Sequence, residues 1–138
     1  MAPMTEPLVS KHGASYKRTV LITGCSDDGL GAALVREFLA KDFFVYATAR
    51  SLAKMASLAD LQDGLELFEL DICSEESISK CAKRLHALDV LVNNAGMTYA
   101  MPFTDTSITQ IRNVFEINVF GHLALTQALL PVLIKSKK

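Results

Sequence analysis

The sequence predicts an α/β fold in which helices cover both faces of a doubly wound parallel sheet. From residue 18 onward, apolar runs alternate with helical patterns, as in successive strand–helix–strand units. The apolar runs are nearly continuous, as expected of strands that are buried on both faces. Right-handed crossovers between parallel strands then restrict the topology to a doubly wound type.

The first predicted strand, residues 19–23 (TVLIT), is short and rich in β-branched side chains, which favour strands. Residues 31–41 predict a helix, because their apolar side chains recur on one helical stripe. The stripe consists of Leu34, Val35, Phe38 and Leu39. Residues 43–48 (FFVYAT) predict the second buried strand.

Residues 51–61 predict a short helix that ends near Gly64, since apolar side chains recur every three residues. These side chains are Leu52, Met55, Leu58 and Leu61. The third strand is predicted at residues 65–70. Ser74 is expected to cap the next helix, and the two glutamates after it favour the positive end of the helix dipole. That helix is expected to bury Ile78, Cys81, Ala82 and Leu85.

A fourth strand is predicted at residues 90–93, and a helical stretch runs from about residue 106 towards the C-terminus. Pro131 is expected to kink or interrupt this stretch, because its ring cannot complete the helical hydrogen bond. Residues 1–17 hold two of the four prolines and show no periodicity, so we expect a flexible leader. Residues 18–138 then form one domain.

The composition of the 138 residues excludes several classes of function. Fourteen Lys and Arg against fifteen Asp and Glu give a formal charge of −1, so no sequence-wide positive field exists to bind nucleic acid or an anionic membrane. No apolar run approaches the ~20 residues that cross a bilayer, and no transmembrane segment is expected. The three cysteines form no CxxC, and the three histidines have no ligand partners at metal-binding spacing, so neither a disulfide framework nor a metal site is expected.

A glycine-rich segment, residues 23–31 (TGCSDDGLG), lies directly between the first strand and the first helix. Glycines at such a turn allow the backbone to approach a phosphate closely, and the helix start supplies unpaired N–H groups. Asp27 and Asp28 count against this interpretation, because carboxylates beside a pyrophosphate repel it unless they point to solvent. A tight loop without a ligand is the alternative.

Two further segments follow strands. Arg50 stands 19 positions beyond Gly31, near where dinucleotide-binding folds place an acidic residue on the ribose 2′-hydroxyl. A guanidinium there can pair with a 2′-phosphate, which favours NADP over NAD; an ordinary solvated arginine is the alternative. Residues 93–96 (NNAG) end the fourth strand and fit either a turn where ligand meets the sheet or a plain turn.

Taken together, these segments resemble the short-chain dehydrogenase/reductase family over residues 19–134. TGCSDDGLG is similar to its cofactor loop, NNAG to its structural signature, the pair Asp71-Ile72 to its adenine contact, and Asn118 to its active-site helix asparagine. The segments VYATAR, LDVLVNNAG and INVFG are most similar to those of fungal reductases related to 1-acyldihydroxyacetone-phosphate reductase. The resemblance implies a Rossmann-type NADP-binding domain whose cofactor-binding residues are Gly24, Ser26, Gly29, Leu30, Gly31, Arg50, Asp71, Ile72, Asn93, Ala95 and Gly96.

Two departures from the family pattern bear on function. Four residues separate Gly24 from Gly29 where three are usual, so we expect the loop to bulge. The family's chemistry implies a catalytic Ser and a Tyr-x-x-x-Lys pair, but Tyr16, Tyr46 and Tyr99 are followed four residues on by Val, Arg and Phe. Asn118 is then the one residue of the catalytic set that can be assigned, and we expect a domain that is incomplete at its C-terminus and inactive alone.

The sequence therefore predicts the NADP(H)-binding part of an oxidoreductase whose parent reaction interconverts carbonyl and hydroxyl groups, on a lipid-like or polyketide-like substrate. The alternatives are a non-catalytic module that binds cofactor or forms heteromers, and a degenerate gene product. The resemblance implies homo- or hetero-oligomers through the last helix. It implies a cytoplasmic location, or a peripheral one on lipid droplets or the endoplasmic reticulum.

Overall fold

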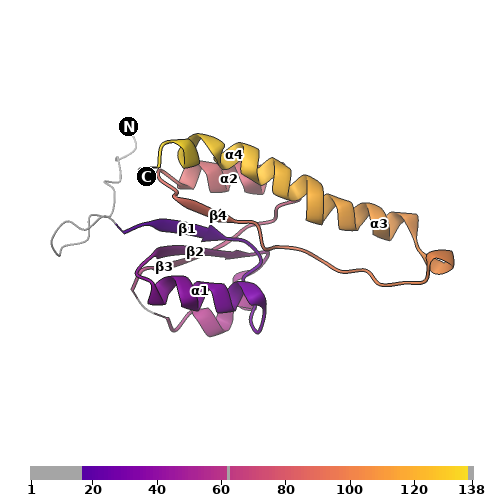
Figure 1. Cartoon of the computed structure of the whole chain (residues 1–138), viewed down its shortest axis with the longest axis horizontal. Helices are drawn as coiled ribbons and strands as arrows, with labels where there is room; N and C mark the ends of the chain where they lie inside the picture. The colour runs from indigo at the N-terminus through magenta and orange to yellow at the C-terminus, as the bar shows by residue number, and fades with distance from the viewer. Residues whose placement is uncertain (1–16, 62, 137–138) are drawn as a thin grey trace.

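The computed structural model describes residues 17–61 and 63–136. Four strands form a parallel sheet in the order β3–β2–β1–β4 (Figure 1). They are β1 (Thr19–Ile22), β2 (Phe44–Ala49), β3 (Leu65–Glu69) and β4 (Val90–Val92). The predicted fold class is confirmed. The predicted leader lies outside the described residues apart from Lys17.

The helices also follow the predicted order. They are α1 (Leu30–Ala40), α2 (Glu75–Arg84), α3 (Ile108–Phe115) and α4 (His122–Ile134). The short helix predicted at residues 51–61 is η1 (Leu52–Leu58), a 3₁₀ helix broken at Met55, whose φ and ψ are −117° and 26°. A single 3₁₀ turn, η2 (Phe103–Asp105), precedes α3, and a π-helical segment, η3 (Glu116–Gly121), joins α3 to α4.

A separate apolar core lies on each face of the sheet, because neighbouring residues of a strand point to opposite faces. On one face α1 and η1 pack against β1 and β2, and this core contains Val20, Ile22, Val35, Val45, Met55 and Leu58. On the other face α2 and α4 pack against Leu21 and β3 (Figure 1), and this core contains Phe68, Ile78, Cys81, Leu125 and Leu129. Because both faces of the sheet are covered, successive residues of its strands must be apolar.

The start of α2 is capped as the sequence predicts. The hydroxyl of Ser74 accepts a hydrogen bond from the backbone N–H of Ser77 at 3.2 Å, which satisfies one of the donors that the first helical turn leaves unpaired. Ile78, Cys81 and Leu85 are buried as expected, whereas Ala82 is half-buried.

Pro131 does not interrupt the last helix, which is a correction to the prediction. It lies inside α4, and the helix continues to Ile134. The missing N–H removes a single helical hydrogen bond, while Leu129 is buried and Val132 and Leu133 pack against the core on the same face. The departure from α-helical geometry occurs instead at η3, ten residues earlier.

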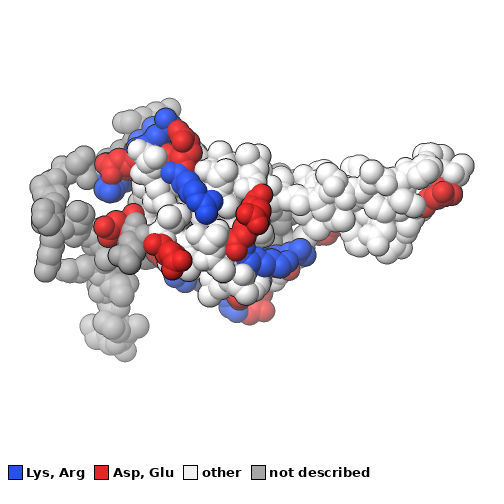
Figure 2. Space-filling view, turned by 90° about the horizontal axis from the view of Figure 1, so that it is seen from below, with Lys and Arg blue, Asp and Glu red and all other residues white. Residues whose placement is uncertain are grey.

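The expected absence of a transmembrane segment is not confirmed. Within the described residues, the helical stretch Ile108–Ile134 is long and apolar enough to cross a membrane by length and composition. Counting uninterrupted apolar runs missed it because scattered polar residues divide the stretch. Core helices of globular proteins pass the same test, so no membrane assignment follows. Figure 2 shows that charged side chains gather over the body of the molecule and are sparse on the projecting arm that ends beyond α3.

The carboxyl ends of β1 and β4 are tied together by Thr23, which is 1% exposed. Its hydroxyl oxygen accepts hydrogen bonds from the backbone N–H groups of Asn94 at 3.0 Å and Ala95 at 2.9 Å. The Asn94 amide donates in return to the carbonyl oxygens of Thr23 at 2.9 Å and Gly24 at 3.1 Å. The loops after the two strands are thus held in fixed relative positions.

Replacing Thr23 by Val tests this connection, because Val keeps the shape and removes the hydroxyl. Two partly buried N–H groups would lose their acceptor, and we expect the free energy of unfolding to fall by about 2 kcal/mol. The control Thr23→Ser keeps the hydroxyl and loses one methyl, for a loss of about 1 kcal/mol or less. Urea unfolding measures both variants; equal losses would show that the hydroxyl contributes nothing.

Candidate functional site

A cleft of about 500 Å³ opens at the carboxyl edge of the sheet, where doubly wound sheets bind their ligands. Loops that follow all four strands contribute to its wall. The lining residues that the sequence also singles out are Gly24, Ser26, Arg50, Asp71, Ile72, Ala95 and Gly96. A second hollow of about 400 Å³ adjoins the cleft along residues 94–97 and is lined further by Thr98, Asn118 and His122.

Three other predicted residues of the glycine-rich segment do not line the cleft. Gly29 is the N-cap of α1, in an extended conformation, and the side chain of Leu30 is 70% exposed. Gly31 is buried, and a Cβ atom there would lie 2.4 Å from the carbonyl oxygen of Gly24. Gly31 is therefore required by the close packing of α1 against the loop after β1.

Gly24 allows this loop to approach the loop after β4. Its φ of +71° is in the left-handed region that favours glycine. A Cβ atom there would lie 2.7 Å from the Cα atom of Ala95. A side chain at Gly24 would thus separate the two loops that Thr23 and Asn94 hold together.

The N-terminus of α1 is suited to an anion. Gly29 offers no side chain to cap the first turn, and that turn contains no acidic residue. The starts of α2 and α3 differ, because Ser74 caps α2 and Ser107 caps α3, and α4 continues directly from η3. Backbone N–H groups at an uncapped helix start lack intrahelical acceptors and attract negative charge.

The two aspartates of the loop do not face the cleft, which removes the main objection to an anion there. The carboxylate of Asp27 accepts hydrogen bonds from the N–H of Ser57 at 3.1 Å and from its hydroxyl at 2.6 Å. Asp28 is exposed and takes up the extra loop residue with a φ of +59°, a conformation that Asp tolerates better than most residues. Neither residue lines the cleft.

Positive charge on the cleft wall comes from Arg50, just after β2, and from Lys54 on η1. Within residues 17–61 and 63–136, the structure shows no ion pair for either side chain. Cys73, also on the wall, is a free thiol. Burial and then the nearby Asp71 carboxylate raise its pKa, with Glu116 adding to the effect and Arg50 opposing it, so the thiol is neutral at pH 7.

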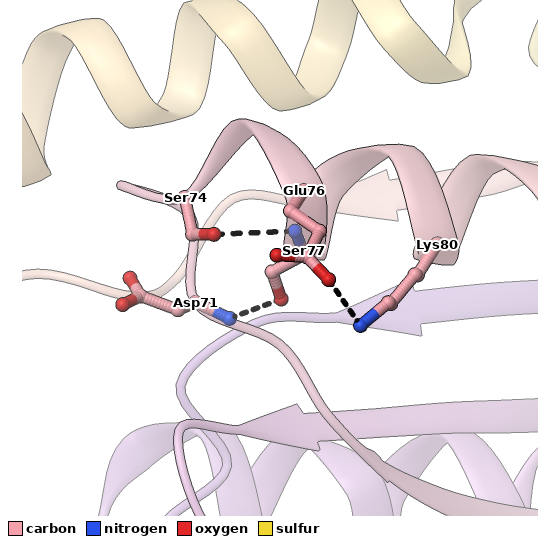
Figure 3. A network of polar contacts seen from close by, with 5 residues as sticks. All are labelled: Asp71, Ser74, Glu76, Ser77 and Lys80. Carbon is pink, nitrogen blue, oxygen red and sulfur yellow. Dashed lines mark hydrogen bonds and ion pairs between the residues drawn. The ribbon is translucent and has the colours of Figure 1, made fainter.

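Asp71 follows β3 and presents its carboxylate away from α2 (Figure 3). Its backbone N–H donates a hydrogen bond to the hydroxyl oxygen of Ser77, in the first turn of α2, at 3.0 Å. One carboxylate oxygen accepts from the N–H of Cys73 at 2.9 Å. These two contacts fix Asp71 on the cleft wall, and among residues 17–61 and 63–136 the structure shows no partner for its second carboxylate oxygen.

Asn93 and Asn94 have different positions although they are neighbours in NNAG. The amide of Asn93, a predicted cofactor-binding residue, donates to the Thr126 hydroxyl at 3.0 Å and does not line the cleft. Asn94 lines it and binds the loop after β1. Successive residues that leave a strand point to opposite faces, so only one of the two can reach the loop.

Asn118 lies in the π-helical segment η3 and pairs with the backbone of Met97. Its side-chain oxygen accepts from the Met97 N–H at 2.9 Å, and its amide donates to the Met97 carbonyl at 2.8 Å. One helical turn later, Nε2 of His122 donates a hydrogen bond to the carbonyl oxygen of Ala95. The ring nitrogen must be the donor, because a carbonyl oxygen only accepts. Asn118 and His122 together hold residues 95–97 against the last helix.

Sequence reasoning missed four residues of this site: Thr23, Lys54, Asn94 and His122. A helical spacing signal existed for Lys54, which lies four residues after Arg50. Thr23 carried a weaker signal as a hydroxyl at the end of an apolar strand. No sequence feature separated Asn94 from Asn93, because their difference depends on the register of β4.

Comparison with known proteins gives one consistent family. A family model described as short chain dehydrogenase matches residues 18–138. A short-chain dehydrogenase/reductase of Pestalotiopsis microspora is 54% identical over 123 residues, which cover 89% of this chain and 45% of that protein. The NADPH-dependent 1-acyldihydroxyacetone phosphate reductase of Schizosaccharomyces pombe is 33% identical over 126 residues, covering 88% of this chain and 42% of the relative.

The fold is shared with solved structures as well. The NADPH-bound carbonyl reductase from chicken fatty liver superposes with a TM-score of 0.75 at 29% identity, covering 87% of this chain and 49% of that one. The chain thus spans about half the length of the relatives it matches. The family match extends over the whole sheet, the cleft and the last helix, and on this basis the chain belongs to the short-chain dehydrogenase/reductase family.

Proposed function

We propose that the chain binds NADP(H) in the cleft, as the nucleotide-binding part of an oxidoreductase. The observation that carries the proposal is that two cations, Arg50 and Lys54, line one cleft together with Gly24 and Ser26, which belong to the loop that leads into the uncapped start of α1. Two similar proteins support it, since the Schizosaccharomyces pombe reductase is NADPH-dependent and the chicken carbonyl reductase is bound to NADPH.

The described residues fit such a cofactor. The first-turn N–H groups of α1 are free to receive a pyrophosphate. Arg50 can pair with a 2′-phosphate, and the Asp71-Ile72 peptide is held where an adenine could contact it. Bound NADPH would supply a hydride to a carbonyl carbon, so the parent reaction is the interconversion of a ketone and an alcohol, on a lipid-like or polyketide-like substrate.

The preference for NADPH over NADH tests the assignment. We expect fluorescence titration of the purified chain to give a Kd for NADPH at least about tenfold below that for NADH, because a charge-assisted contact to the 2′-phosphate exists with only one of them. Arg50→Asp should abolish this difference by placing a carboxylate where the phosphate would lie. The exposed Arg112→Asp on α3 is the matched control. Equal affinities in the unmodified chain would contradict the NADP assignment.

We further propose that residues 1–138 alone do not catalyse hydride transfer. None of the three tyrosines has a Lys four residues on, and a free phenol with a pKa near 10 is a poor proton donor at neutral pH without a positive neighbour. Burial raises the pKa of Tyr46 further. NADPH oxidation, followed by absorbance with a panel of ketones, should stay at background under conditions in which a full-length relative turns over. Turnover at the relative's rate would refute this proposal.

A heteromer-forming module is the second candidate function. Nine of the eleven large hydrophobic side chains that are exposed in the described part of the chain lie between Met101 and Ile134. Exposed apolar surface of this extent is typical of interaction sites. Mixing the chain with a full-length relative should give a mixed complex by size-exclusion chromatography with light scattering. Phe120→Asp, which places a charge on this surface, should abolish it, whereas a chain that elutes alone would contradict this function.

A further inference from the structure

We propose that Lys54 is a specificity-determining residue for the 2′-phosphate and that Asp27 is its positioning residue. This inference rests on the proposed NADP(H) binding and adds a second cation to Arg50. It also assigns a use to the Asp27 carboxylate, which by its charge alone would oppose anion binding.

Lys54 shares the cleft wall with Arg50, four residues earlier in the chain. Arg50 follows the last residue of β2, and Lys54 lies in the first turn of η1, the next helix in the chain. Neither cation has an ion-pair partner within residues 17–61 and 63–136. Two unpaired like charges held on one wall repel each other, and a dianionic phosphate between them would relieve that repulsion.

The backbone of Lys54 is fixed by the glycine-rich loop. The N–H of Asp27 donates to the carbonyl oxygen of Lys54 at 2.7 Å, and the N–H of Lys54 donates to the carbonyl of Ser51 at 3.1 Å. The first turn of η1 is thus bonded at one end to its own N-cap residue, Ser51, and at the other to the loop at the start of α1.

The side chain of Asp27 fixes the second turn of η1. Helical geometry breaks at Met55, two residues before Ser57, and the Ser57 N–H donates to the Asp27 carboxylate at 3.1 Å. The Ser57 hydroxyl donates to the same carboxylate at 2.6 Å and accepts from Arg36 of α1 at 3.2 Å. Asp27 therefore holds both turns of η1 against the loop that would bind the pyrophosphate.

Two interpretations of Asp27 predict opposite changes in NADPH affinity when Asp27 is replaced by Ala. If Asp27 were only a negative charge near an anion, Asp27→Ala would tighten NADPH binding by removing repulsion. If it positions Lys54, Asp27→Ala weakens NADPH binding and leaves NADH binding nearly unchanged. A general loss of folding would weaken both nucleotides alike, so the ratio of the two affinities isolates the positioning role.

The test measures the Kd for NADPH and for NADH in a set of variants of the full chain. Lys54→Gln should raise the NADPH Kd by about fivefold, a modest factor because the side chain is exposed, and leave the NADH Kd unchanged. The control Lys83→Gln removes an exposed lysine of α2 that does not line the cleft and should change neither. Asp27→Asn keeps an acceptor for Ser57 and should retain most of the preference that Asp27→Ala loses.

A double variant completes the test. In the Lys54→Gln background, Asp27→Ala should have no further effect on the NADPH preference, because the residue it positions is already gone. Additive losses, an unchanged preference in Lys54→Gln, or tighter NADPH binding by Asp27→Ala would each overturn the inference while the proposed function stands. Failure of the unmodified chain to prefer NADPH would overturn both.

Discussion

The junction between the ends of β1 and β4 is the constraint on which the rest of the site depends. One hydroxyl, that of Thr23, accepts two backbone N–H groups, and one amide, that of Asn94, donates to two carbonyls. Polar groups this far from water are stable only when they are paired. The partners lie about seventy residues apart in sequence. The junction therefore holds two separate loops side by side, and together these loops form part of the cleft wall.

Small residues make the junction possible by allowing close approach. Gly24 admits the backbone of Ala95, and Gly31 admits the carbonyl of Gly24. The two glycines thus act through packing, while the proposed anion binding would depend on the uncapped start of α1. On the opposite side of the loop, Asp27 directs its charge to Ser57, so the same segment can hold acidic residues and still present a positive cleft.

The sequence was sufficient for the architecture, since the apolar runs and helical stripes that predict four strands and their helices depend on local periodicity. Ser74 as a cap follows from local chemistry in the same way. The positions of Asn93 and the orientation of Asp27 could not be predicted, because they depend on strand register and on a contact with Ser57 thirty residues away. Pro131 is the opposite case. Proline is expected to interrupt a helix, but α4 continues through Pro131 because neighbouring side chains such as Leu129 pack in the core.

The central claim is that the first-turn N–H groups of α1 receive the pyrophosphate of a nicotinamide dinucleotide. A crystal structure of the chain grown with NADP⁺ tests it most directly. The account predicts density for the diphosphate within hydrogen-bonding distance of the α1 start, with the 2′-phosphate beside Arg50. An aspartate carboxylate occupying that helix start, or a nucleotide bound elsewhere on the molecule, would contradict it.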